Sequence, residues 1–156
     1  VSAEERQGYR AVMGSDGSRA ASMECPSRTN DNFLTGKLPT VGFTTMEGQE
    51  IFKFAVKKVP ECTGALLEAN GLEKEEIKYF VLHQANYRIV EAIAKRMKLP
   101  VERFPMNIAK YGNTSGATIP ILLDELNREG KLAQGDKIVV SGFGAGLTWG
   151  AALLEW

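Results

Sequence analysis

The sequence predicts an α/β fold in which helices cover a mixed β-sheet. Three observations lead to this prediction: short apolar runs typical of buried strands, longer segments with helical periodicity, and an order in which strands and helices alternate. The length of 156 residues suits one domain, and 44% hydrophobic with 24% charged residues is typical of a globular protein with an ordinary core.

The N-terminal part of the chain is predicted to be mostly irregular. Residues 8–14 (GYRAVMG) suit a short strand, whereas residues 15–45 are rich in Ser, Gly, Asn, Asp and Thr and lack apolar periodicity. A loop of about thirty residues is long for a compact domain, which indicates a functional segment or absent packing partners.

Three segments have the apolar spacing of helices. They cover residues 47–70, 86–98 and 115–128. In the first, Pro60 should cause a kink or break near Lys58, because proline lacks a backbone donor and clashes with the preceding turn. The third should begin with Ser115 as its N-cap and end at Gly130.

Three further runs suit strands. They cover residues 77–82, 137–141 and 147–154. The first is apolar almost throughout, as expected of a strand buried on both faces. The last two are joined by a glycine-rich turn at residues 142–146.

The charge and cysteine content exclude some functions. Nineteen basic and nineteen acidic residues cancel, which argues against general nucleic-acid or membrane binding. No apolar run approaches the roughly 18–20 residues of a membrane span, and no secretory signal opens the chain. Cys25 and Cys62 lack zinc-site spacing and cannot build a disulfide scaffold, so we expect a cytoplasmic protein with no metal site. Because the chain begins with Val1, we expect it to be part of a longer protein.

The single histidine occupies a position suited to chemistry. His83 directly follows the strand at 77–82 and precedes the second helix. Ligands of α/β sheets bind beyond the carboxyl ends of strands, and a nearby helix N-terminus favours a neutral imidazole. A structural, hydrogen-bonded histidine explains the same position.

A second candidate is the segment Tyr-Gly-Asn-Thr-Ser-Gly at residues 111–116. The carboxamide of Asn113 offers two neutral donors that could hold a carbonyl oxygen as it becomes an enolate. A turn followed by a helix N-cap is the alternative explanation.

The third candidate is the glycine-rich turn at residues 142–146. Its backbone could approach a ligand closely and direct N–H groups toward it. It is not a phosphate loop, because no Gly-Lys-Ser/Thr sequence follows and the next element is a strand. A plain hairpin turn remains an equal alternative.

Basic residues gather in residues 84–110, with six bases against two acids and a net charge of +4. Lysines at 53, 57 and 58 add positive charge on the first helix. A solvated helix face is the usual explanation of such a surface, and the alternative is a docking site for an acidic partner or a phosphate-bearing ligand.

Taken together, these motifs resemble β-ketoacyl-acyl carrier protein synthase III, the condensing enzyme that initiates bacterial fatty-acid synthesis. The resemblance rests on His-Gln-Ala-Asn at 83–86, Gly-Asn-Thr-Ser at 112–115 and Gly-Phe-Gly-Ala-Gly-Leu-Thr-Trp-Gly at 142–150. Residues 15–18 and 46–53 also follow the family pattern. The resemblance implies the C-terminal half of a thiolase-like fold, with a mixed five-stranded sheet and helices on both faces. Residues 1–45 would then be the end of the preceding half and a connecting loop, and 46–156 the catalytic domain.

The resemblance also implies a mechanism. An acyl group is carried by a cysteine that lies in the other half, and malonyl-acyl carrier protein loses carbon dioxide and attacks the thioester. His83 and Asn113 would donate hydrogen bonds to the malonyl thioester oxygen, and the backbone N–H of Ala145 would serve the oxyanion hole. The family usually has glycine at the position of Ala145, so a positive φ there would strain the backbone. The acyl and pantetheine channel would be lined by Phe52, Asn86, Phe143 and Gln49.

The resemblance implies partners as well. Lys53, Arg88, Lys95 and Arg96 would dock the acidic acyl carrier protein. The substrates would be CoA and phosphopantetheine thioesters, with no cofactor, and the full-length enzyme would be a homodimer. Alone, this half should be inactive and expose an apolar face that favours self-association. Two alternatives remain: a non-catalytic module that binds CoA or carrier protein, and a self-contained hydrolase that uses Cys25 with His83 and Asn113.

Overall fold

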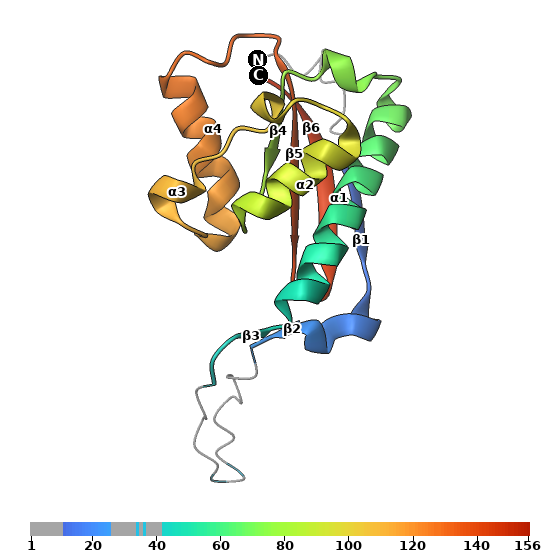
Figure 1. The fold of residues 1–156 in the computed structure, drawn as a ribbon, viewed down its shortest axis with the longest axis vertical. Helices are drawn as coiled ribbons and strands as arrows, with labels where there is room; N and C mark the ends of the chain where they lie inside the picture. The colour runs from blue at the N-terminus through green and yellow to red at the C-terminus, as the bar shows by residue number, and fades with distance from the viewer. Residues whose placement is uncertain (1–10, 26–33, 35, 37–41) are drawn as a thin grey trace.

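The centre of the molecule is a mixed four-stranded sheet (Figure 1). The computed structural model describes residues 11–25, 34, 36 and 42–156. The strands, in spatial order, are β1 (Ala11–Ser15), β6 (Thr148–Glu155), β5 (Lys137–Gly144) and β4 (Tyr79–Leu82). β4 and β5 are parallel, whereas β5 with β6 and β1 with β6 are antiparallel. The predicted mixed sheet is therefore confirmed.

The expected fifth strand is not part of this sheet within the described residues. The sequence contains four apolar runs of strand length, and each forms one strand. Two further strands of two residues each, β2 (Met23–Glu24) and β3 (Thr45–Met46), pair only with each other. The five-stranded prediction is wrong for the described part of the chain because no other segment there offers an apolar run to either sheet edge.

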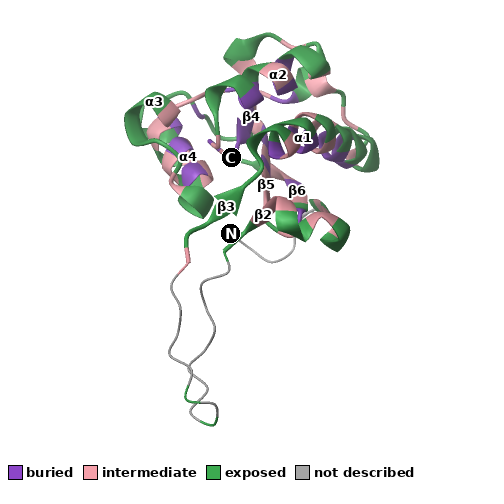
Figure 2. Cartoon of the chain, turned by 60° about the horizontal axis from the view of Figure 1, so that its bottom comes forward, coloured by how far each residue is buried: buried purple, intermediate pink, exposed green. Residues whose placement is uncertain are grey.

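Helices cover both faces of the sheet, as predicted. α1 (Gly48–Asn70) and α2 (Tyr87–Met97) pack on one face, and α4 (Thr118–Arg128) packs on the other. Alternation along β4 produces this division, since Phe80 and Leu82 belong to the core under α1 and α2 while Val81 belongs to the core under α4. Buried residues follow the strands and the helix sides that face them (Figure 2).

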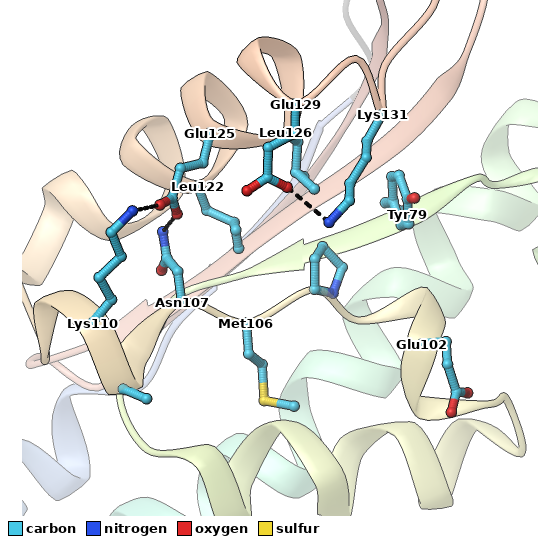
Figure 3. Close-up of a pocket in the computed structure, with 12 residues that line it drawn as sticks. Tyr79, Glu102, Met106, Asn107, Lys110, Leu122, Glu125, Leu126, Glu129 and Lys131 are labelled. Atoms are coloured by element: carbon cyan, nitrogen blue, oxygen red, sulfur yellow. Dashed lines mark hydrogen bonds and ion pairs between the residues drawn. The ribbon is translucent and has the colours of Figure 1, made fainter.

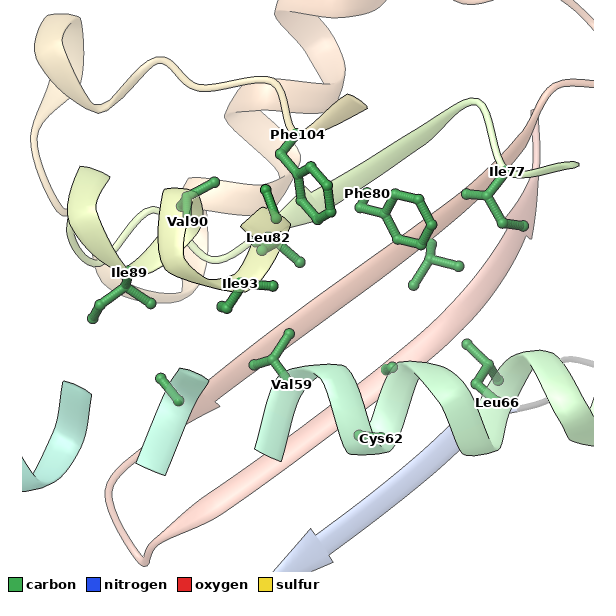
Figure 4. Packing of buried hydrophobic residues seen from close by; sticks show 14 of the residues in the cluster. Val59, Cys62, Leu66, Ile77, Phe80, Leu82, Ile89, Val90, Ile93 and Phe104 are labelled. Atoms are coloured by element: carbon green, nitrogen blue, oxygen red, sulfur yellow. The ribbon is translucent and has the colours of Figure 1, made fainter. Parts of the chain in front are cut away.

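The larger core lies between the sheet and the α1–α2 pair. Phe80 stacks on Phe104 with ring centroids 5.0 Å apart, and the aliphatic side chains of both helices close around them (Figure 4). Fully burying such side chains contributes about 1.5–3 kcal/mol each. This core fixes β4 and α2, and therefore the short connection between them that carries His83.

α1 is continuous through Pro60, so the predicted break near Lys58 does not occur. Proline costs the helix one hydrogen bond. Residues on both sides of it, including Val59 and Cys62, are buried against the sheet and its neighbour α2, and this packing holds the helix together.

The loop predicted for residues 15–45 contains some regular structure where it is described. A 3₁₀ helix, η2 (Gly17–Ser22), is capped by Asp16, whose carboxylate accepts a hydrogen bond from the backbone N–H of Ser18 at 3.0 Å. A polar turn sequence can therefore form a short capped helix without apolar periodicity. Part of the predicted loop lies outside the described residues.

Residues 101–117 contain short elements that periodicity could not predict. They are η4 (Val101–Arg103), the single-turn helix α3 (Ile108–Tyr111) and the 3₁₀ helix η5 (Ser115–Ala117). Ser115 is not the N-cap of α4, because it has φ 57° and starts the 3₁₀ turn that precedes Thr118. The predicted end of α4 is confirmed by Gly130, which has φ 67°.

β1 is part of the four-stranded sheet, because all five of its residues pair with β6. The division that we expect at residue 46 stays a prediction. Among the described helices, none is long and apolar enough to cross a bilayer.

Candidate functional site

His83 lies where the parallel pair β4 and β5 ends. Its backbone N–H donates to the carbonyl of Ser141 at 2.8 Å, which extends the β4–β5 ladder by one bond. The side chain is half-buried, and its ring meets that of Phe143 edge-on with centroids 5.5 Å apart. The first and third predicted motifs therefore come together at this end of the sheet.

The imidazole of His83 is held by a threonine that begins α4. Its Nδ1 lies 2.6 Å from Oγ1 of Thr118, and that hydroxyl in turn lies 2.9 Å from the carbonyl oxygen of Ser115. Burial lowers the pKa of His83 below its usual 6.5, and the Ser115 carbonyl opposes this shift by favouring a protonated ring. The site therefore favours a neutral imidazole near pH 7.

Asn113 lies in the loop that leads into this contact. Its Oδ1 accepts a hydrogen bond from the backbone N–H of Ser115 at 2.9 Å. The residue is exposed, and this bond occupies the carboxamide oxygen while leaving the NH₂ group directed to other partners. Ser115 thus connects the second motif to His83 through Thr118. The hydrogen bond between Asn113 and Ser115 also forms the turn that was the alternative explanation, and it does not occupy the NH₂ group that a ligand would need.

The glycine-rich turn joins β5 and β6 in an antiparallel hairpin, as predicted. Ala145 is exposed at its tip, and its carbonyl accepts a hydrogen bond from the hydroxyl of Thr148 at 3.0 Å. Among the described non-glycine residues, only Lys98 and Ser115 have positive φ. Alanine at 145 therefore does not bring the left-handed strain that a replacement of glycine can cause.

The predicted channel residues occupy two regions. Asn86 caps α2 by accepting from the N–H of Arg88 at 2.8 Å, and it lines a hollow of about 570 Å³. That hollow is also lined by Ala85, Tyr87, Arg88, Met106, Ile108 and Ala109. Phe52 and Gln49 are exposed on the first turns of α1. The buried residues of those turns pack in one cluster with Phe143.

The predicted docking residues also divide between two helices. Arg88, Lys95 and Arg96 are exposed on α2. Lys53 on α1 is exposed but bonds to Glu50 at 3.0 Å, and Glu50 also pairs with Arg19 at 2.7 Å. The carboxylate offsets part of the positive charge on α1, so the net positive surface is concentrated on α2.

Three residues of the site were not singled out by the sequence analysis. They are Gln84, Thr118 and Glu125. The carboxylate of Glu125 accepts a hydrogen bond from Asn107 at 2.7 Å and pairs with Lys110 (Figure 3). It also accepts a hydrogen bond from the hydroxyl of Tyr111 at 3.0 Å. These contacts attach α3 to α4 beside a second hollow of about 430 Å³. Only Gln84 gave a signal, as the second residue of the His-Gln-Ala-Asn motif that follows the buried strand.

Comparison with known proteins resolves the family. Residues 67–156 match the family described as the C-terminal part of 3-oxoacyl-[acyl-carrier-protein] synthase III. The chain belongs to this family. The predicted resemblance is confirmed, and with it the thiolase-like α/β fold, because solved synthase III structures superpose on most of the chain.

One related sequence and two solved structures illustrate the similarity. The β-ketoacyl-[acyl-carrier-protein] synthase III of Clostridium acetobutylicum is 46% identical over 148 residues, which cover 94% of this chain and 46% of that protein. The crystal structure of the Thermus thermophilus synthase III matches with a TM-score of 0.85 and 40% identity, covering 97% of this chain and 47% of that one. The Pseudomonas aeruginosa synthase III matches with a TM-score of 0.82 and 36% identity, covering 94% and 43%. The chain spans less than half the length of these relatives.

Proposed function

We propose that this chain supplies the histidine–asparagine half of a β-ketoacyl-[acyl-carrier-protein] synthase III condensing site. The reaction would join an acyl primer to malonyl-acyl carrier protein with loss of carbon dioxide. The nucleophilic cysteine would come from an N-terminal half of the same enzyme. The observation that carries the proposal is the hydrogen-bonded chain from His83 through Thr118 and Ser115 to Asn113.

The chemistry requires stabilisation of negative charge rather than a strong base. When the malonyl group loses carbon dioxide, its thioester oxygen gains enolate character, and donors placed at that oxygen lower the barrier. Within the described residues, the NH₂ group of Asn113 makes no hydrogen bond and is available for this purpose. The half-buried His83 offers a ring nitrogen in a site partly shielded from water. One donor of this kind contributes about 3–4 kcal/mol in the transition state.

The remaining groups would bind the substrates. The backbone N–H of Ala145 would donate to the acyl thioester oxygen, and Phe143 would line the acyl channel beside His83. The hollow at the N-terminus of α2, with Asn86 on its wall, is large enough for part of a pantetheine arm. Arg88, Lys95 and Arg96 would contact the acidic carrier protein, and the complete enzyme would form a homodimer.

A chimera tests the proposal. The N-terminal part of the Clostridium acetobutylicum relative is fused to this chain, and decarboxylation of malonyl-acyl carrier protein and condensation with acyl-CoA are measured. Asn113→Ala and His83→Ala should each lower the rate by about 10²–10³. Asn127→Ala, at an exposed position of α4, serves as the control and should have no effect. A folded chimera without activity, or one indifferent to both substitutions, would contradict the proposal.

A second candidate is a module that binds CoA or carrier protein without chemistry. The open hollow beside Arg88 and the positive face of α2 favour binding irrespective of catalysis. Calorimetric binding of CoA by the chain, combined with an inactive but folded chimera, would support this candidate over the first.

A further inference from the structure

Thr118 is placed to control His83 although it belongs to none of the three motifs. It is the first residue of α4 and is 2% exposed. Its Oγ1 lies 2.6 Å from Nδ1 of His83 and 2.9 Å from the carbonyl oxygen of Ser115. The second distance is typical of a hydrogen bond, and the first is slightly shorter than the usual 2.7–3.2 Å between nitrogen and oxygen, so both pairs of atoms are in direct hydrogen-bond contact.

Counting protons defines the direction of these two bonds. A hydroxyl group has one proton to donate and lone pairs with which to accept, whereas a carbonyl oxygen can only accept. The bond to Ser115 therefore uses the proton of Thr118. The contact with Nδ1 is then satisfied only if the imidazole donates and the threonine oxygen accepts.

We infer that Thr118 is the positioning residue that sets the tautomer and orientation of His83, with the proton on Nδ1 and a lone pair on Nε2. The same hydroxyl also anchors the carbonyl of Ser115, whose N–H holds the carboxamide oxygen of Asn113. One side chain thus fixes the ring of His83 relative to the loop that carries Asn113.

The consequence for catalysis rests on the proposed function. A neutral His83 in this tautomer accepts a hydrogen bond at Nε2, and it donates there only after that nitrogen has taken up a proton from solvent. Asn113 is then the permanent donor to the thioester oxygen, whereas His83 becomes a second donor in its protonated form. Thr118 decides which of these two roles the histidine has at rest.

The tautomer can be observed directly because the chain contains a single histidine. The full 156-residue chain is labelled with ¹⁵N in its imidazole, and the two ring-nitrogen shifts and their proton couplings are recorded well above the pKa of the ring. In the wild type we expect Nδ1 to carry the proton. Thr118→Val keeps the size of the side chain but removes the hydroxyl, so the ratio of Nδ1–H to Nε2–H tautomers should fall roughly tenfold, as expected for the loss of one hydrogen bond.

Two further variants separate positioning from packing. Thr118→Ser retains the hydroxyl and should retain the wild-type tautomer. Thr63→Val is the matched control, because Thr63 is fully buried and its hydroxyl has no hydrogen-bond partner in the described part of the chain. It should leave both ring-nitrogen signals unchanged. If Thr118→Val does not fold, Thr118→Ala replaces it with the same expectation.

Two results would overturn the inference: a wild-type ring protonated on Nε2, or a ratio of tautomers that is equal in the wild type and in the hydroxyl-free variant. The readout does not depend on turnover. An inactive chimera with the expected tautomers would therefore reject the proposed function alone, and an active chimera with the wrong tautomer would reject only the role of Thr118.

Discussion

The side-chain carbonyl of Gln84 accepts a hydrogen bond from the backbone N–H of Asn107 at 3.3 Å. Gln84 is fully buried, and its amide also donates to the carbonyl of Leu82 at 2.8 Å. One side chain therefore satisfies backbone groups in two segments, the end of β4 that carries His83 and the segment that leads through α3 to Asn113. This bridge fixes the position of the His83 motif relative to the segment that leads to Asn113.

Replacing Gln84 with methionine should destabilise the chain by about 1–3 kcal/mol. Methionine fills a similar volume but leaves the N–H of Asn107 without its partner in a partly buried position. Urea denaturation measures the change, with Gln49→Met at an exposed position as the control. Equal stability of the two variants would show that the bridge contributes nothing.

The fold was predictable wherever one local signal was sufficient. The apolar run of β4 and the end of α4 before Gly130 are both present as expected. Pro60 is different, because whether a proline breaks a helix depends on how firmly its flanks are packed, and that packing comes from distant strands.

The site was only partly predictable for the same reason. His83 could be identified from its place after a strand, since that place is encoded locally. Thr118 acts on a ring 35 positions earlier in the chain, and Glu125 joins residues 14–18 positions before it. No periodicity encodes such contacts. The backbone of Ser115, with its positive φ, is also set by this network and not by its residue type.

Glu125 should make the stability of the chain depend on pH in the acid range. Its contacts with Lys110 and Asn107 lower its pKa from 4.5 to about 2. Stability from this group is therefore complete above pH 4.5 and is lost as the pH falls toward 2, because the unfolded chain takes up the proton first. The difference in unfolding free energy between wild type and Glu125→Gln should shrink over this interval.

The control for this prediction is Glu129, a more exposed carboxylate directly after α4. Glu129→Gln breaks an ion pair with Lys131 in which both side chains are about half exposed, at 52% and 54%. Water screens such a pair, so its removal should change the stability little at any pH. A wild-type minus Glu125→Gln difference that stays constant from pH 5 to 2.5 would contradict the role of the Glu125 contacts.

His83 should produce a separate effect at higher pH. Burial lowers its pKa in the folded chain, so the unfolded chain binds the proton first on acidification. The stabilising contribution is complete above about pH 6.5 and declines as the pH falls through the folded pKa. An NMR titration of the single histidine should give a midpoint below 6.5, and His83→Gln should remove the decline measured between pH 7 and 5. A midpoint above 6.5 would contradict this account.

Reversing the charge of Arg88 should weaken use of the carrier protein. In the chimera, Arg88→Glu should raise the KM for malonyl-acyl carrier protein by about tenfold and change the KM for acyl-CoA much less, because in the proposed docking the charge of Arg88 faces the acidic carrier protein. The effect should diminish at high salt. Arg128→Glu carries the same change of charge on α4 and should have no such effect. Equal carrier-protein kinetics for wild type and Arg88→Glu would reject the docking role.

Gly14 of β1 should tolerate no side chain, because the aromatic ring of Trp149 occupies the space beside it. A Cβ atom at this position would lie 2.4 Å from Cζ2 of Trp149, which is much closer than non-bonded carbon atoms approach. The indole cannot withdraw easily, since it packs edge-on against Phe54 at 5.7 Å and lies under the ammonium group of Lys58.

Gly14→Ala should therefore destabilise the chain by about 1–3 kcal/mol through overpacking. Gly17→Ala is the matched control, because its added Cβ meets no atom within 4 Å and it should change stability by less than about 0.5 kcal/mol. Thermal denaturation followed by tryptophan fluorescence compares the two, and equal midpoints would mean that β1 can shift away from β6 without cost.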